Sequence, residues 1–244
     1  AIKLIKPGMD TREVILRFEA ERQALALMEH PNIARVIDAG ATRTGLPYFV
    51  MELVEGEPLT AFCDRNRLNL KSRLELFLAV CGAVQHAHQK GVVHRDLKPT
   101  NILVAEQDAR PVVKVIDFGI AKAIEQADSG RTLHTKHGFS MGTPQYMSPE
   151  QAGSSREDID IRSDIYSLGV LLYEMLTGQP PLTRERIESV RPEEVYQLIS
   201  EEVPEKPSAR VNSLKCGSRK DSAHVSGELP GRLSEAIQRD LDWV

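Results

Sequence analysis

The stretch His94-Arg95-Asp96-Leu97-Lys98-Pro99-Thr100-Asn101 is a short charged segment between apolar ones. A region in which apolar residues recur at helical spacing precedes it, and the apolar run Ile102-Leu103-Val104 follows it. A second acid, Asp117, stands at the end of the next strand-like run and opens the tripeptide Asp117-Phe118-Gly119. Acids in a charged loop and at a strand end are typical of an active site, because loops on a rigid scaffold carry much of protein chemistry.

The composition is ordinary for a globular protein of 244 residues, with 41% hydrophobic and 27% charged residues. A net charge of −4 gives no reason to expect a nucleic-acid partner. The chain has no apolar run near the ~18 residues that a membrane span needs. Cys63, Cys81 and Cys216 are far apart, which fits a reducing, cytoplasmic compartment better than a disulfide framework.

The first part of the chain is predicted to contain strands and one helix. Apolar spacing predicts the helix over residues 11–29. It ends at His30-Pro31-Asn32, because proline disfavours helical backbone in the residue before it. We expect strands at residues 1–5, 34–39 and 48–54, with a hairpin turn at 44–47.

Beyond residue 55 the pattern is mostly helical. A long helix is predicted at 71–90, ended by Gly91, with an apolar face formed by Leu74, Phe77, Leu78, Cys81, Val84 and His88. Shorter helices are expected around 165–175, at 195–199 and from Leu233 onward, and short strands at 102–104 and 113–116. The polar stretches 125–141 and 204–230 are expected to be loops.

The residue types in and after the opening stretch suit phosphoryl transfer. Asp96 can accept a proton from a hydroxyl group, and Lys98 can neutralise charge on a transferring group. Asn101 and Asp117 offer oxygen ligands, which suit Mg²⁺ rather than zinc. Metal, charge neutralisation and positioning are what this reaction requires.

Lys3 and Glu21 form a second candidate group, because one is expected on a strand and the other on a helix. They can form an ion pair in which the lysine also holds phosphate oxygens. Taken alone, such a pair is more often an ordinary surface ion pair that contributes little.

These motifs resemble the protein kinase family. The pattern at residues 94–101 matches the catalytic loop, and Asp117-Phe118-Gly119 matches the magnesium-binding motif. Ala1-Ile2-Lys3 resembles the end of the V-A-I-K strand, Ser148-Pro149-Glu150 stands for A-P-E, and Asp164 matches the acid that braces the catalytic loop. Lys98 and residues 142–151 are similar to serine/threonine kinases, in particular to bacterial eukaryotic-type ones.

The resemblance implies an α+β, bilobal kinase fold. Its small, β-rich N-lobe would cover residues 1–54 and its larger, mainly helical C-lobe residues 55–244. It also implies ATP and Mg²⁺ as cofactors, and proteins with serine or threonine hydroxyls as substrates.

It further implies a role for each site residue. Asp96 deprotonates the substrate hydroxyl, Lys98 contacts the γ-phosphate, and Thr143 helps to shape the site. Asn101 and Asp117 hold Mg²⁺. By the same resemblance, Lys3, paired with Glu21, holds the α- and β-phosphates of ATP. Met51 is the gatekeeper residue behind the adenine, and the backbone from Glu52 to Val54 binds the adenine edge. Ala1 and Leu103 enclose the adenine ring.

Regulation is implied by Arg95 beside the catalytic acid, because a phosphate added to the following loop would pair with that arginine. The candidate acceptors are Thr132, Thr135 and Ser140.

The sequence departs from the family pattern at both ends. The glycine-rich loop of kinases precedes the strand that carries Lys3, and the chain begins at that strand. The end of the large lobe, with the arginine that pairs with Glu150, is expected beyond Val244. We therefore expect this piece alone to bind Mg-ATP weakly. Two interpretations stay open: an active serine/threonine kinase, and a truncated pseudokinase that binds partners without catalysis.

Overall fold

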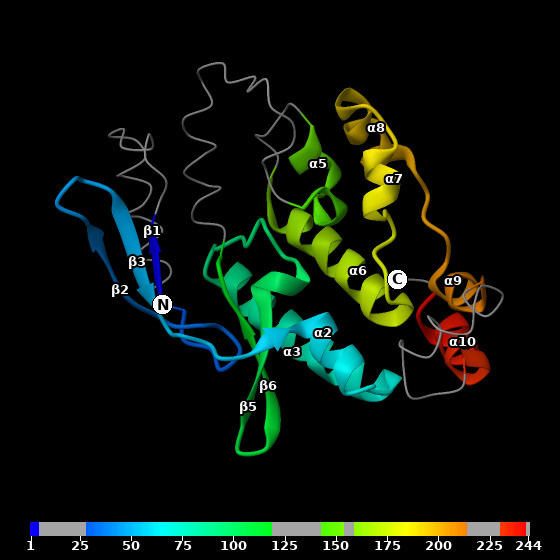
Figure 1. Cartoon of the computed structure of the whole chain (residues 1–244), viewed down its shortest axis with the longest axis horizontal. Coiled ribbons are helices and arrows are strands. Elements are labelled where there is room, and N and C mark those ends of the chain that lie inside the picture. Colours follow the sequence, from blue (N-terminus) through cyan, green and yellow to red (C-terminus); the bar gives the residue numbers. More distant parts are fainter. Residues whose placement is uncertain (5–27, 119–142, 154–158, 214–229, 243–244) are drawn as a thin grey trace.

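The computed structural model describes residues 1–4, 28–118, 143–153, 159–213 and 230–242. A three-stranded sheet lies at one end of the molecule, a second sheet lies in the middle, and helices fill the other end (Figure 1). The predicted loop at 125–141 and most of the predicted helix at 11–29 lie outside the described residues. So do Glu21, Thr132, Thr135 and Ser140.

The first sheet is antiparallel, in the order β1-β3-β2, and Lys3 lies opposite Phe49 in it. Its hairpin turn is closed by Thr42 N–H, which donates to the carbonyl of Leu46, and Gly45 takes φ +82° there. Glycine adopts this backbone conformation without steric cost. The strands are β1 (Ile2–Leu4), β2 (Val36–Ala41) and β3 (Pro47–Met51). The three predicted strands and their turn are confirmed, with shifted boundaries.

The second sheet has the strand order β4-β5-β6, and it brings the polar loop close to Asp117. Ile102 pairs with Val115, so the residues just before β5 lie beside those just after β6. The hairpin tip consists of Asp108 and Ala109, which both have positive φ, as the type I′ turn of a two-residue hairpin loop requires. The strands are β4 (Glu57–Pro58), β5 (Ile102–Gln107) and β6 (Arg110–Val115).

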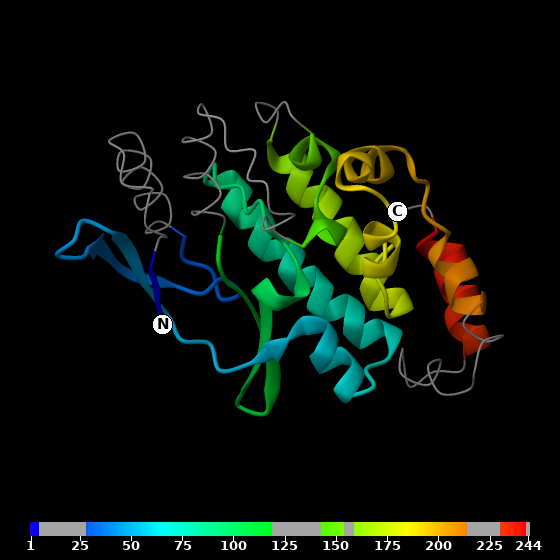
Figure 2. The ribbon, with the colours of Figure 1, turned by 45° about the horizontal axis from the view of Figure 1, so that its top comes forward.

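Two long helices form the centre of the helical part and lie side by side (Figure 2). These are α3 (Leu70–Gln89) and α6 (Ile161–Thr177). Asn69 caps the start of α3 by accepting from the N–H of Ser72, and Gly178 ends α6 in the left-handed conformation. The shorter helices are α2 (Leu59–Arg65), α5 (Pro149–Ala152), α7 (Arg184–Glu188), α8 (Val195–Glu201), α9 (Pro207–Ser213) and α10 (Pro230–Asp240), with 3₁₀ turns η1 (Pro99–Asn101), η2 (Pro144–Tyr146) and η4 (Pro192–Glu194).

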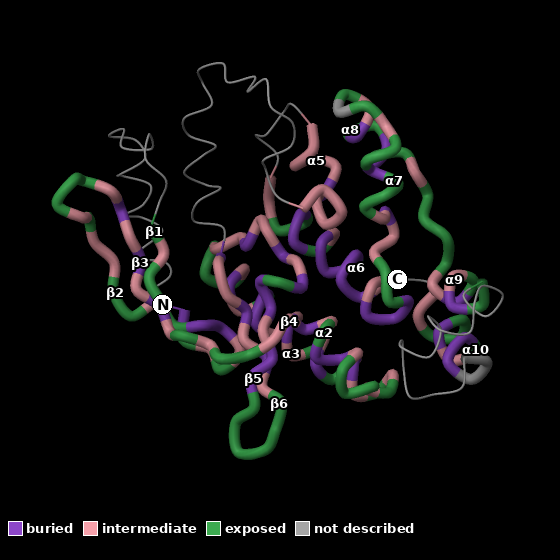
Figure 3. Tube along the Cα trace, in the orientation of Figure 1, coloured by how far each residue is buried: buried purple, intermediate pink, exposed green. Residues whose placement is uncertain are grey.

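The main hydrophobic core runs between α3, α6 and the second sheet and continues to the first sheet, as the buried segments in Figure 3 show. It joins Val80 of α3, Leu171 of α6, Ile102 of β5 and Phe49 of β3, each at most 1% exposed. This shared core holds the polar loop between the sheets and the helices. Among the described residues, no helix combines the length and apolar composition needed to cross a bilayer.

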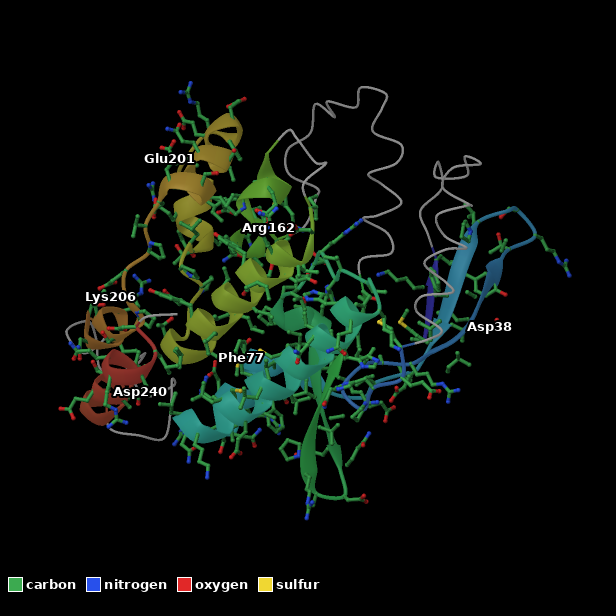
Figure 4. All side chains as sticks on the ribbon, turned by 180° about the vertical axis from the view of Figure 1, so that it is seen from behind. Asp38, Phe77, Arg162, Glu201, Lys206 and Asp240 are labelled. Carbon is green, nitrogen blue, oxygen red and sulfur yellow. The ribbon has the colours of Figure 1, made fainter. Side chains whose placement is uncertain are left out.

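The predicted face of α3 was partly wrong. Leu78 is 67% exposed, whereas the most buried positions are Arg73, Leu76, Val80, Ala83, Val84 and Ala87. The apolar pattern missed this face because it contains small alanines and a charged residue. Phe77, labelled in Figure 4, is only partly buried and packs both against the main core and against a second cluster that includes Leu172 and Leu176.

Arg73 can be buried because each of the three nitrogens of its guanidinium has a hydrogen-bond partner. Its guanidinium donates to the carbonyls of Leu68 and Met175 and to Asp64 Oδ1, at 2.7–3.0 Å. A buried charge is tolerated when it is paired and hydrogen-bonded. The side chain therefore links α2, α3 and α6.

The polar stretch 204–230 was expected to be a loop, and its start is instead helix α9 (Pro207–Ser213). Proline is favourable in the first turn of a helix, where its missing N–H has no helical partner. Ser208 then donates through both N–H and Oγ to the carboxylate of Asp242, at 3.1 and 2.6 Å. This contact with the segment after α10 is long-range, so the local composition did not reveal it.

Candidate active site

The polar loop brings three predicted site residues into direct contact. Asp96 Oδ2 lies 2.8 Å from Lys98 Nζ and accepts from Asn101 Nδ2 at 3.0 Å. The same Nδ2 donates to the Asp96 carbonyl at 2.9 Å. Pro99 begins the 3₁₀ turn η1, which bends the chain so that Asn101 returns to Asp96. An acid, a cation and an amide are thus held as one group.

Asp164 of α6 holds the backbone of this loop. Its carboxylate is 1% exposed and accepts from the N–H groups of His94 and Arg95, both at 2.8 Å. It also lies 2.7 Å from His88 Nε2 on α3. A buried carboxylate is stable only with such donors. The prediction that Asp164 braces the loop is confirmed.

His94 is fully buried beneath the loop, as predicted, with its ring 4.7 Å from that of Phe118. Nε2 faces the carbonyl of Ile116 at 3.0 Å, and Nδ1 faces the N–H of Asp96 at 3.3 Å. A carbonyl needs a donor and an N–H needs an acceptor, so the ring carries its proton on Nε2. Burial lowers the pKa of His94, which keeps this neutral form. His94 is therefore structural.

Asn101 and Asp117 lie together because of the pairing between β5 and β6. The N–H of Ile116 donates to the carbonyl of Asn101 at 2.9 Å, which places Asp117 one residue away. The Asn101 NH₂ group is used on Asp96, so its amide oxygen is the atom that remains for a cation. This oxygen and the Asp117 carboxylate are hard donors that fit Mg²⁺.

The side chain of Lys3, on β1 of the first sheet, extends to Asp117. Its Nζ lies 3.0 Å from Asp117 Oδ1, and each side chain is 33% exposed. The sequence had suggested Glu21 as the partner of Lys3, and Glu21 lies outside the described residues. The lysine–aspartate pair was not anticipated, because nothing in the local pattern links two residues more than a hundred positions apart.

Comparison with known proteins agrees with this arrangement. A family model described as "Protein kinase domain" matches residues 1–224. The chain belongs to the protein kinase family. The chain is 44% identical over 203 residues to serine/threonine-protein kinase PknB of Mycobacterium tuberculosis, covering 82% of this chain and 30% of that protein. It is 41% identical over 224 residues to probable serine/threonine-protein kinase PknB of Bifidobacterium longum, covering 88% and 31%. It thus spans about a third of the length of these curated relatives.

The chain also matches a solved structure. The kinase domain of PknI from Mycobacterium tuberculosis superposes with a TM-score of 0.60 at 25% identity, over 98% of this chain and 84% of that one. The predicted α+β, bilobal kinase fold is confirmed, as is the resemblance to bacterial eukaryotic-type serine/threonine kinases. The division of the lobes at residues 54 and 55 stays a prediction.

Among the residues predicted to bind the nucleotide, Met51 is 9% exposed at the end of β3, and its backbone pairs with that of Ala1. Leu103 is half-buried on β5, in register with Pro58 and Lys114. The segment after Met51 is described but belongs to no helix or strand, as the predicted hinge requires. The roles of these residues toward adenine stay predictions.

Glu52 directs its side chain toward strand β6 and the segment before β2. Its Oε1 lies 3.0 Å from Lys114 Nζ, and its Oε2 accepts from the N–H of Arg35 at 3.1 Å. Its own N–H donates to the Arg35 carbonyl at 2.8 Å. Burial opposes ionisation, but these hydrogen bonds and the nearby ammonium lower the pKa of Glu52 overall. The expected hinge is thus fixed to both sheets.

Helix α5 supports the catalytic loop through a residue that the sequence did not single out. Gln151 Nε2 donates to the Arg95 carbonyl at 2.8 Å, and its Oε1 accepts from the N–H of Ser148 at 3.1 Å. The signal was present in the sequence, because Ser148 and Gln151 have the spacing of a capping box. Glu150, expected to lack an arginine partner, accepts from Ser163 Oγ at 2.6 Å.

Thr143 directly precedes η2, which two hydrogen bonds fix to α6. Tyr146 Oη donates to Glu174 at 2.5 Å, and Ser167 Oγ donates to the Tyr146 carbonyl at 2.8 Å. Burial raises the pKa of Glu174, and the bond from Tyr146 only partly offsets this. The segment that carries Thr143 is therefore anchored to the same helix as the catalytic loop, while the role of Thr143 stays a prediction.

Proposed function

We propose that this chain is the catalytic domain of a serine/threonine protein kinase, which transfers the γ-phosphate of ATP to serine and threonine hydroxyls of proteins. One observation carries the proposal. Asp96, Lys98 and Asn101 are in mutual hydrogen-bond contact, and the β5–β6 pairing places Asp117 beside Asn101. A base, a cation and two oxygen donors for a metal are what phosphoryl transfer needs.

In this proposal Asp96 receives the proton of the substrate hydroxyl as the hydroxyl oxygen bonds to the γ-phosphorus. The bond between that phosphorus and the oxygen of the leaving ADP breaks in the same transfer. Lys98 already lies at the Asp96 carboxylate and holds it in place, and it is positioned to neutralise charge on the phosphoryl group. Thr143 would complete the surface that receives serine or threonine.

Asn101 and Asp117 would hold Mg²⁺, which when bound supplies positive charge to the phosphate oxygens. Lys3 would hold the α- and β-phosphates, with Glu21 as its predicted partner. The adenine would lie among Ala1, Met51 and Leu103 and be read by the backbone from Glu52 to Val54. The motifs of the family support these assignments, and the contact of Lys3 with Asp117 and the pairing that brings Asn101 beside Asp117 add to that support.

The names of the bacterial relatives support serine/threonine rather than tyrosine specificity. The pseudokinase alternative finds no support, since Asp96, Lys98, Asn101 and Asp117 are all present and in contact or adjacent. Cys63 and Cys81 are free thiols in the described part of the chain, which fits a reducing compartment. We therefore place the domain in the cytoplasm, where ATP is available. Its proposed partners are protein substrates rather than nucleic acids.

Phosphate transfer to casein from radiolabelled Mg-ATP tests the proposal. We expect the rate to fall about a thousandfold in Asp96→Asn, because the base is removed. Asp38→Asn makes the same chemical change at an exposed position of strand β2, labelled in Figure 4, that is not among the proposed site residues, and should keep the wild-type rate. Equal rates for the wild type and Asp96→Asn would refute the proposed function.

A further inference from the structure

Gln151 uses both ends of its amide in different places. Its Oε1 accepts from the N–H of Ser148 at the start of α5, and its Nε2 donates to the carbonyl of Arg95 in the catalytic loop, at 3.1 and 2.8 Å. Only one orientation of the amide satisfies a donor and an acceptor together. The side chain is half-buried, so water competes only partly for these bonds.

The carbonyl that Gln151 binds belongs to an unusual residue. Arg95 has φ +64°, a conformation that non-glycine residues rarely adopt and that the surroundings must hold in place. Asp164 Oδ1 accepts from the N–H of Arg95 at 2.8 Å, and Gln151 holds its carbonyl. The backbone of Arg95 is therefore bound from both sides, by α6 and by α5.

The peptide group between Arg95 and Asp96 is hydrogen-bonded at both ends. Its carbonyl end is bound by Gln151, and its N–H end donates to His94 Nδ1 at 3.3 Å. With both ends bound, the plane of this peptide is fixed, and the direction in which the Asp96 side chain leaves the backbone is fixed with it. Ser148 and Gln151 come shortly after η2 in the chain. The position of η2 and α5 therefore affects Asp96 through the Gln151 side chain.

We propose that Gln151 is a positioning residue for Asp96, which it orients through the peptide group between Arg95 and Asp96. This inference rests on the proposed function of Asp96 as the base. Gln151 does not touch the substrate. It makes the geometry of the base depend on helix α5, so that the catalytic loop is correctly set only when α5 is in place.

Gln151→Glu is the sharpest test, because the side chain keeps its shape. The carboxylate still accepts from the N–H of Ser148, but it cannot donate and places an acceptor opposite the Arg95 carbonyl. We expect kcat to fall about tenfold while KM for ATP stays within a factor of two. Gln85→Glu, the same change at an exposed position of α3, is the matched control and should leave both constants unchanged.

The pH profile separates positioning from general damage. A protonated Glu at position 151 can donate to the Arg95 carbonyl while still accepting from Ser148, as the native glutamine does. The ratio of variant to wild-type kcat should therefore rise toward one as the pH falls from 8 to 5.5. A ratio that does not change with pH, with a matching loss of thermal stability, would mean a merely structural role and would overturn the inference.

Amide hydrogen exchange of residues 94–101 gives a readout that does not need activity. We expect faster exchange in this peptide for Gln151→Glu and no change for Gln85→Glu. If the wild type transfers no phosphate, the proposed function fails, and the exchange rates still decide whether Gln151 fixes the loop. Wild-type exchange in Gln151→Glu would contradict the proposal by itself.

Discussion

Lys3 Nζ lies 3.0 Å from Asp117 Oδ1, and this ion pair joins the edge strand of the first sheet to the segment that follows the last strand of the second, two residues past its end. Both side chains are one-third exposed, so the pair contributes little to stability. Its importance lies in position, because it sets an ammonium beside the carboxylate that we assign to the metal.

Lys3→Met should therefore harm the reaction much more than the fold. We expect kcat/KM for ATP to fall about a hundredfold, as when one preorganised charge is removed from a reacting group. The unfolding free energy should change by less than about 1 kcal/mol. Steady-state kinetics and urea denaturation measure the two effects. Lys71→Met, which changes an 86% exposed lysine on α3, serves as the control. A large loss of unfolding free energy with normal kinetics would show that Lys3 serves the stability of the fold and not the reaction.

Asp164→Asn should destabilise the protein by about 3 kcal/mol, because a buried carboxylate that binds charged or polar donors is replaced by an amide whose NH₂ faces N–H groups. Asp160→Asn is matched in chemistry, and Asp160 lies four residues earlier, at the N-cap position of α6. Its side chain is 49% exposed and caps the helix start, a role that asparagine fills equally well. Urea denaturation should show almost no change for this control. Similar losses in both variants would argue against the bracing role.

Arg73→Met tests the charged residue within the buried face of α3. The variant leaves the Met175 carbonyl and Asp64 without their donor, so we expect a loss of about 2–3 kcal/mol in unfolding free energy. Arg65→Met removes an arginine that is 60% exposed and paired with Glu57, and should change stability by less than about 1 kcal/mol. If Arg73→Met were as stable as the wild type, the hydrogen bonds of the buried guanidinium would not contribute to stability.

Lys114→Met tests the link between Glu52 and β6. We expect KM for ATP to rise about threefold with kcat unchanged, since a partly exposed ion pair contributes at most ~1 kcal/mol to fixing the hinge. Lys90→Met, at the exposed end of α3, should leave KM at the wild-type value. A change in kcat alone would contradict a role in nucleotide binding.

The same variant has a predicted pH dependence. The pKa of Glu52 is lowered from the ordinary value of 4.5, so its pairing stabilises the folded state above that pH and is lost as the pH falls through the lowered value. The difference in Tm between the wild type and Lys114→Met should therefore be constant from pH 7 to 5 and shrink below 4.5. A difference that grew on acidification would show that Glu52 is not the partner.

The local motifs predicted the catalytic loop and the position of Asp164, because short segments of this kind need little information from the rest of the chain. What they could not supply were contacts between distant elements. Lys3 was assigned to Glu21, and its contact with Asp117 depends on how the two sheets face each other. The burial of Arg73 was not predicted, because two of its partners are the backbone carbonyls of Leu68 and Met175, and every residue has a carbonyl.

Gln151 shows a third kind of limit. Its capping-box spacing with Ser148 was visible in the sequence, but only the fold shows that the other end of its amide reaches Arg95, 56 positions earlier. The start of α9 was missed for a similar reason, because its serine is held by Asp242. Local polarity identified neither contact.

The hairpin of β5 and β6 has a practical consequence for protein engineering. The ladder from Ile102 and Val115 to Gln107 and Arg110 fixes how Asn101 and Asp117 face each other at its base, while Asp108 and Ala109 form an exposed tip at the far end (Figure 1). An epitope tag or a fluorophore-bearing peptide inserted between these two residues would leave the ladder intact. The tip thus offers a permissive attachment point for labelling this domain or for immobilising it on a sensor surface.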